Sequence, residues 1–159
     1  MKEQDFLRKA TRDGQLEIVE PSENICESYM QKSENSLKSA DLLFSNGIYE
    51  NSAIEAYYAV YNSITALLRK VGIKCENHAV SISLLETLFG EKKLRAMASD
   101  VRDKRLDFQY YVSHIATKEN AAEAISKAEN LCAAIGLLAR KLTSEQGTSA
   151  RDKLKRMLG

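Results

Sequence analysis

The chain has 159 residues, a formal net charge of +1, one proline and 44% hydrophobic residues. This length is enough for one domain with a substantial core. The near-neutral charge excludes a general electrostatic attraction to nucleic acid, so any such role requires a local basic patch. No apolar run approaches the ~20 residues of a membrane-spanning helix, and the polar N-terminal stretch MKEQDFLRKATRDG does not resemble a signal peptide. We therefore expect a cytoplasmic protein without a membrane contact.

The cysteines and histidines are few and widely spaced. Cys26, Cys75 and Cys132 are odd in number and show no metal-ligand spacing, and the chain has only two histidines. Reduced, structural thiols are the expected state, and a catalytic cysteine without a nearby base is the alternative. We expect neither a bound metal nor another cofactor.

The composition favours helix throughout, and no run of alternating β-branched residues predicts a sheet. We predict an all-α fold, an antiparallel up-and-down bundle of about five helices preceded by a short extended leader. Residues 1–21 form this polar leader, with a short helix at Asp5–Lys9 and an extended run at Leu16–Val19. The leader either packs on the body or on a second copy, or it is disordered.

The bundle is predicted over residues 22–142. Its first helix begins at Ser22 or Asn24, where Asn24 and Glu27 have the spacing of a capping pair, and it ends before the turn at residues 46–47. That short turn predicts an antiparallel hairpin with the next helix.

Residues 49–72 form the central helix, because nearly every position is apolar or small and a glycine, Gly72, ends it. A narrow polar stripe interrupts the apolar surface at positions seven apart, namely Glu55, Asn62 and Arg69.

Three further helices complete the bundle. After a loop at residues 73–77 we predict helices over residues 78–89, 92–109 and 118–142, the last one capped by Thr117. The remaining residues, 143–159, are predicted to be a polar hinge (143–149) and a short basic helix.

The run SAIEAYYAVY at residues 52–61 resembles the second helix of HEPN (higher eukaryotes and prokaryotes nucleotide-binding) domains. ADLLFSNGIY at 40–49, LLRKVGIK at 67–74, His78 at the next helix start and VRDKRLDFQY at 101–110 follow in the order of the small stand-alone prokaryotic branch. The resemblance covers roughly residues 14–142. It implies a helical bundle that pairs as a homodimer. It also implies either a ribonuclease, often a toxin, or a nucleotide-binding partner of a small nucleotidyltransferase.

The family's ribonucleases use an arginine to hold the scissile phosphate and a histidine a few positions later to move protons. Arg102 and Asp103 match the start of this motif, but Asp107 stands where the histidine is expected. An aspartate is ionised at neutral pH and repels phosphate. His114 is the next histidine, and eight residues separate it from Arg105. The nuclease motif is therefore incomplete.

Two interpretations of this helix end remain open. One is a salt-bridged terminus that supports a dimer or a loop. The other is a phosphate, nucleotide or RNA pocket, with Arg102 and Arg105 as phosphate ligands, Asp107 beside them and Tyr110 stacking or hydrogen-bonding. Six cations against two aspartates over residues 92–105 favour the pocket, although a solvated helix face gives the same pattern.

His78 has a structural alternative as well, since a histidine at a helix start often caps or donates to a carbonyl. If it faces a groove shared with Arg102, then Asn62 and Arg69 form the far wall of that groove. The tyrosines at 57, 58 and 61 are expected in the core, with hydroxyls that reach polar partners.

Three functions follow. The first is a non-catalytic nucleotide- or RNA-associated binding module, with a nucleotidyltransferase partner in a toxin–antitoxin-like pair. The second is a divergent metal-independent ribonuclease that uses Arg102 with His78 or His114. The third is a purely structural dimerisation module.

Overall fold

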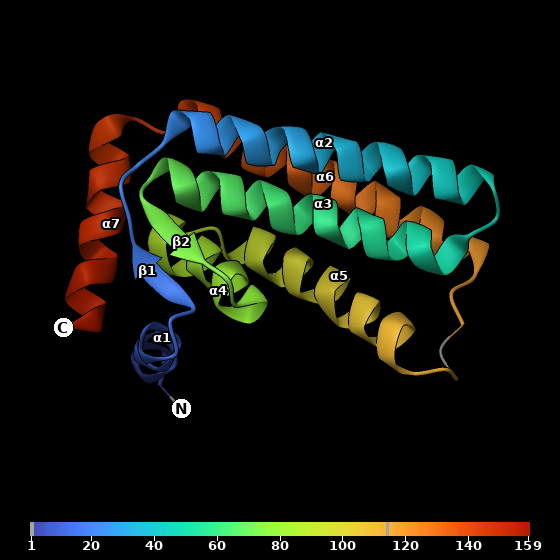
Figure 1. Ribbon diagram of the computed structural model, residues 1–159, viewed down its shortest axis with the longest axis horizontal. Helices are drawn as coiled ribbons and strands as arrows, with labels where there is room; N and C mark the ends of the chain where they lie inside the picture. Colours follow the sequence, from blue (N-terminus) through green and yellow to red (C-terminus); the bar gives the residue numbers. More distant parts are fainter. Residues whose placement is uncertain (1, 114) are drawn as a thin grey trace.

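The computed structural model describes residues 2–113 and 115–159, which form seven helices and one two-stranded sheet (Figure 1). The elements in chain order are α1 (Glu3–Arg12), β1 (Leu16–Ile18), α2 (Glu23–Ser45), α3 (Tyr49–Lys70), β2 (Ile73–Cys75), α4 (His78–Phe89), α5 (Lys92–Tyr110), α6 (Lys118–Lys141) and α7 (Ser144–Leu158). The predicted all-α bundle is confirmed. Helices α2 to α6 are its five members, and α1 and α7 are longer than the short terminal helices that the sequence predicts.

α3 is the centre of the bundle. It lies between α2 and α6 on one side and α4 and α5 on the other, and 12 of its 22 residues are buried. Buried serines join it to α2, since Ser52 Oγ donates to the Ala40 carbonyl and Ser33 Oγ donates to the Ala59 carbonyl, both at 2.7 Å. Because both hydroxyls have acceptors, these hydrogen bonds compensate the cost of burying the serines.

The leader packs on the body. β1 pairs antiparallel with β2, with Leu16 opposite Cys75, and both of these residues are buried. The predicted loop at residues 73–77 is thus wrong in its first three residues, which form β2. The pairing follows a left-handed turn at Gly72 (φ 85°), where a Cβ atom would lie 2.5 Å from the Val19 carbonyl oxygen. Only glycine fits this position without moving β1.

The structure decides between two predicted starts of α2 and corrects the predicted start of the last helix. Ser22, and not Asn24, caps α2, because its side chain accepts from the Ile25 amide at 3.2 Å. The expected hinge at residues 143–149 is helical, because Thr143 and Gln146 form a capping box that starts α7 there. α7 lies crosswise at one end of the bundle (Figure 1). The predicted cap at Thr117 and the predicted span of α4 are confirmed.

No helix that the described residues form is both long and apolar enough to cross a membrane.

Candidate functional site: an arginine–histidine cluster on α3, α4 and α5

α4 places His78 against the tyrosines of α3. The Asn77 side chain caps the helix by accepting from the Val80 amide at 3.0 Å, which fixes His78 as the first helical residue. The imidazole stacks on the Tyr61 ring, with centroids 3.8 Å apart and planes inclined by 20°. Its Nδ1 atom lies 2.6 Å from the Tyr57 hydroxyl. The ring is therefore held both on its face and at one nitrogen.

α5 brings Arg105 to the same tyrosines. The guanidinium carbon lies 4.5 Å from the centre of the Tyr57 ring and 5.8 Å from that of Tyr58, in cation–π geometry. Arg105 is 7% exposed, and its Nη1 donates to Gln109 Oε1 at 2.7 Å. Among the described residues no carboxylate forms an ion pair with Arg105, and its buried Nε has no hydrogen-bond acceptor. A nearly buried cation without a counter-ion is costly and therefore calls for an anion.

Arg102 lies one turn before Arg105 on α5. Residues three apart share a helix face, so both arginines belong to one surface. The Arg102 side chain is partly exposed and forms an ion pair with Asp103 at 3.4 Å, while the Arg102 Nε atom is buried without an acceptor. Tyr57, His78, Arg102 and Arg105 are called the Arg–His cluster below.

Burial and charge together hold His78 neutral. Burial is the larger cause of its lowered pKa, and the positive charges of Arg105 and then Arg102 lower the pKa further. Both effects penalise the imidazolium. At pH 7 the imidazole of His78 is therefore a neutral group next to two cations.

The hydrogen-bond geometry assigns the tautomer of His78. Burial raises the pKa of Tyr57 to about 12, although the Arg105 charge opposes the shift, so the phenol keeps its proton at neutral pH. The guanidinium beside Tyr57 has only donors, so the phenol proton points to Nδ1 of His78. Neutral His78 therefore carries its proton on Nε2, where it acts as a hydrogen-bond donor.

Among the described residues, Asp107 and Tyr110 form no hydrogen bond or ion pair with the side chains of the cluster. Asp107 is partly buried, and the ion-pair partner of Arg102 is Asp103 and not Asp107. Tyr110 is 66% exposed at the last position of α5. His114 lies outside the described residues.

Within the described residues, no hydrogen bond or ion pair joins the proposed far wall of the groove to the cluster. Asn62 and Arg69 are partly buried on α3, and among the described residues neither has a hydrogen bond or ion pair with His78 or Arg102. On an ideal helix Asn62 points roughly 140° away from Tyr57. These two residues therefore face a different side of α3 from the tyrosine that holds His78.

The basic strip of α5 is neutralised in part. Arg95 pairs with Glu86 at 2.7 Å, and Lys104 pairs with Glu123 of α6 at 3.2 Å. Lys127 joins the second network, with Asp100 at 2.7 Å and Glu123 at 2.8 Å. These ion pairs fasten α5 to α4 and α6. Arg105 differs from the other cations of this helix because it is nearly buried and, among the described residues, has no carboxylate partner.

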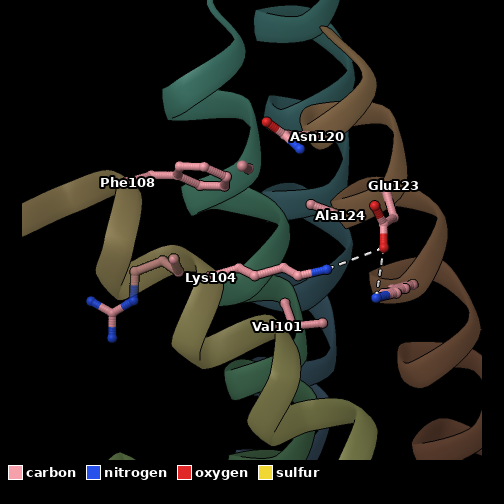
Figure 2. A pocket seen from close by; sticks show the side chains of 9 residues that line it. Val101, Lys104, Phe108, Asn120, Glu123 and Ala124 are labelled. Atoms are coloured by element: carbon pink, nitrogen blue, oxygen red, sulfur yellow. Dashed lines mark hydrogen bonds and ion pairs between the residues drawn. The ribbon is translucent and has the colours of Figure 1, made fainter. Parts of the chain in front are cut away.

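A cavity between α3, α5 and α6 lies beside these ion pairs (Figure 2). Val101, Phe108 and Ala124 supply its apolar wall, and the Lys104–Glu123 ion pair closes one side. Its volume is about 20 Å³, enough for roughly one water molecule. The cavity is a packing defect and not a ligand pocket.

The sequence predicts that Tyr57 lies in the core, but it does not predict the hydrogen bond between Tyr57 and His78. The signal was there, because Tyr57 and Tyr61 are four residues apart and share a helix face. A histidine at the start of a following helix was the polar partner that the buried hydroxyl needed. Gln109, which binds Arg105, had no comparable signal.

Comparisons with known proteins agree with this architecture. The HEPN domain family model matches residues 26–138. A candidate toxin of Methanocaldococcus jannaschii is 26% identical over 107 residues, which cover 65% of this chain and 80% of that protein. Within the described residues, no group of three or more histidine, cysteine, aspartate or glutamate side chains is placed to hold a metal ion.

Proposed function

The chain belongs to the HEPN domain family, and from this premise we propose that it is a toxin-like RNA- or nucleotide-binding module. Its ligand's phosphate binds at Arg102, Arg105 and His78. The observation that carries the proposal is Arg105, which is nearly buried and has no carboxylate partner among the described residues. A phosphate oxygen supplies the missing negative charge and accepts charge-assisted hydrogen bonds. The similarity to a candidate toxin supports the toxin-like part of this proposal.

His78 contributes a neutral donor to this ligand. The Nε2–H group is the one that Tyr57 does not occupy, and a neutral N–H group binds a phosphate oxygen without adding a third cation to the cluster. The arrangement combines two guanidinium groups and one imidazole, all of them donors, and this combination suits an anion with several acceptor oxygens.

The same tautomer supports a binding role over catalysis. A general base needs a lone pair on the nitrogen that faces the substrate, whereas the Tyr57 hydrogen bond places the lone pair of His78 on the inner Nδ1. Asp107, at the motif position of the histidine, does not replace it, since a carboxylate repels phosphate.

Metal-independent RNA cleavage is the second candidate. It is favoured by the fold, which brings His78 into the electrostatic environment of Arg102 and Arg105 although no histidine follows Arg102 at the family's spacing. Cleavage requires another state of His78. One is the imidazolium, which gives its Nε2 proton to the leaving oxygen as a general acid and returns to the neutral form. The other is the Nδ1–H tautomer, whose Nε2 lone pair accepts the proton of the attacking hydroxyl as a general base.

Binding of a 5′-labelled single-stranded RNA, followed by fluorescence anisotropy at several salt concentrations, tests the proposal. We expect an affinity that falls with salt and falls about tenfold or more in Arg102→Ala, since one charge-assisted hydrogen bond contributes about 1.5–3 kcal/mol. Lys93→Ala, an exposed cation on the same helix, is the matched control. Equal affinity of Arg102→Ala and the parent protein would refute the binding site. Cleavage of the RNA in EDTA that is lost in His78→Gln would instead establish the ribonuclease.

Self-association is part of the proposal. Among the described residues seven large hydrophobic side chains are exposed, and six of them lie in or beside the α2–α3 and α5–α6 connections, at the same end of the bundle (Figure 1). They are Leu42, Ile48, Tyr110, Tyr111, Val112 and Ile115. Such a concentration is typical of a protein–protein interface and supports a homodimer. Analytical ultracentrifugation of Val112→Asp tests this interface, with Leu137→Asp, an exposed leucine on α6, as the control.

A small nucleotidyltransferase is the proposed protein partner, on the strength of the family resemblance. Co-expression with an enzyme of this class encoded beside the chain tests it. A stable complex after size-exclusion chromatography supports the pairing, and separate elution of the two proteins counts against it.

A further inference from the structure

A groove of about 650 Å³ runs between α2 and α6, and none of its lining residues belongs to the Arg–His cluster. α2 and α4 lie on opposite sides of α3, so the groove and His78 are well separated (Figure 1). On α2 the groove extends from Glu23 to Leu37, which at the rise of an α-helix is a length of roughly 21 Å. This length matches about four turns of a docked helix.

The floor of the groove is mainly apolar. Met30 and Leu37 of α2 are only partly buried, and α6 presents small residues opposite them, including Ala133 and Gly136. Small side chains let the backbone of a second helix approach closely, and partly exposed Met and Leu side chains gain from being covered.

Gly136 is the most informative of these residues. A glycine inside a helix is destabilising relative to alanine, and a close packing neighbour on its open side is one reason for its presence. The fold itself supplies none here, because a Cβ atom built at Gly136 meets only the flexible Arg140 side chain, at 3.9 Å. The missing side chain therefore leaves space in the groove itself, which suits an occupant from outside the chain.

The rim of the groove is acidic. Four glutamates line it (Glu23, Glu27, Glu34 and Glu129) against two cations, Lys70 and Arg140. Lys70 is engaged already, since its Nζ donates to the Ala139 carbonyl at 2.6 Å and pairs with Glu23 at 3.7 Å. Among the described residues the other three glutamates form no ion pair. This charge repels a phosphate backbone and attracts a basic peptide.

We propose that the groove between α2 and α6 docks an amphipathic helix of a partner protein, with leucine-like side chains on its inner face and Lys or Arg along its flanks. The apolar floor receives the inner face, Gly136 allows close backbone approach, and Glu27, Glu34 and Glu129 pair with the flanking cations. The partner binds independently of the ligand of the Arg–His cluster.

A synthetic 16-residue stapled helix with leucines along one face and lysines on its flanks serves as the probe. We expect saturable one-to-one binding by fluorescence anisotropy. The same peptide with glutamates in place of the lysines is expected to bind at least about tenfold more weakly. Equal binding of the two peptides, or no binding of the lysine peptide at millimolar protein, would overturn the proposal.

Matched variants place the binding in the groove. Gly136→Leu fills the floor and Glu34→Lys reverses one rim charge, and each is expected to weaken the lysine peptide about tenfold or more. Ala122→Leu on α6 and Asp41→Lys on α2, both exposed and outside the groove, are the controls. Gly136→Leu should melt no lower than the parent protein, because leucine is the better helix former. A dimer of this chain that dissociates in Gly136→Leu would assign the groove to a second copy and overturn the partner proposal.

Discussion

The hydroxyl of Tyr57 lies 2.6 Å from Nδ1 of His78, in a position where the tyrosine is fully buried and the histidine is half-buried. A buried hydroxyl on α3 thus determines which nitrogen of a histidine on α4 carries the proton. Because the neutral imidazole accepts this hydrogen bond, the contact favours the neutral form. Tyr57 is therefore a positioning residue, which sets the state of His78 without reaching a ligand itself.

Replacing Tyr57 by phenylalanine tests this relationship. Tyr57→Phe removes the donor to Nδ1, so the pKa of His78 should rise relative to the parent protein, and the unpaired Nδ1 should cost about 1–3 kcal/mol of folding stability. Imidazole nitrogen shifts in a two-dimensional NMR titration report both the tautomer and the pKa. In the parent protein we expect the Nε2–H form. Tyr58→Phe, one residue along the same helix, is expected to leave the titration unchanged.

The lowered pKa of His78 predicts the direction of the pH dependence of ligand binding. Above the unfolded value of 6.5 the neutral imidazole contributes stability to the folded state, which is lost as pH falls through the folded pKa. A bound phosphate stabilises the imidazolium and so raises this pKa. By linkage, affinity for RNA should rise as pH is lowered from about 7.5 to 5.5. Anisotropy titrations should show this rise, and His78→Gln should remove it. A rise of the same size in His78→Gln would place the titrating group elsewhere.

The fold was predictable because its signals are local. An apolar surface around most of residues 49–72 requires neighbours on several sides, and α3 has them. Ser22 and Asn24 both had cap chemistry, and only the backbone geometry decides between them. β2 escaped prediction because three residues carry too little periodicity to separate a strand from a loop.

The candidate site was predictable only in part, because its contacts join distant segments. The sequence named Arg102, Arg105 and His78 as candidates, but helix periodicity does not say which face of α5 meets Tyr57 on α3. The burial of Arg105 follows from that pairing. Asn62 and Arg69 share one stripe along α3, and the sequence places this stripe toward His78. The spacing of residues along a helix gives their direction around that helix, but it does not say which neighbouring helix they face.

The close approach of Gly72 to the Val19 carbonyl predicts how strongly the packing of the leader depends on this glycine. Gly72→Ala forces a left-handed backbone on alanine and also places its Cβ 2.5 Å from the Val19 carbonyl oxygen, so β1 must shift. We expect a loss of about 3 kcal/mol in urea unfolding. Gly90→Ala is the control, because Gly90 has a similar φ of 72° but no atom within 4 Å of its Cβ position. It should cost only about 1–2 kcal/mol. Equal losses for the two variants would mean that the leader adjusts freely.

Arg105→Met separates the stability of the cluster from its function. A buried cation without a carboxylate partner destabilises the fold, and a methionine of similar length fills the same space beside the Tyr57 ring without that cost. The lost cation–π contact, about 0.5–2 kcal/mol, partly offsets the gain. We therefore expect a melting temperature equal to or above that of the parent protein, together with RNA affinity that is at least about tenfold weaker. Arg95→Met, which breaks the surface ion pair with Glu86, should lose under about 1 kcal/mol and retain RNA binding. If Arg105→Met unfolds the protein while Arg102→Ala leaves RNA binding intact, the buried arginine is a structural residue and the cluster holds no phosphate.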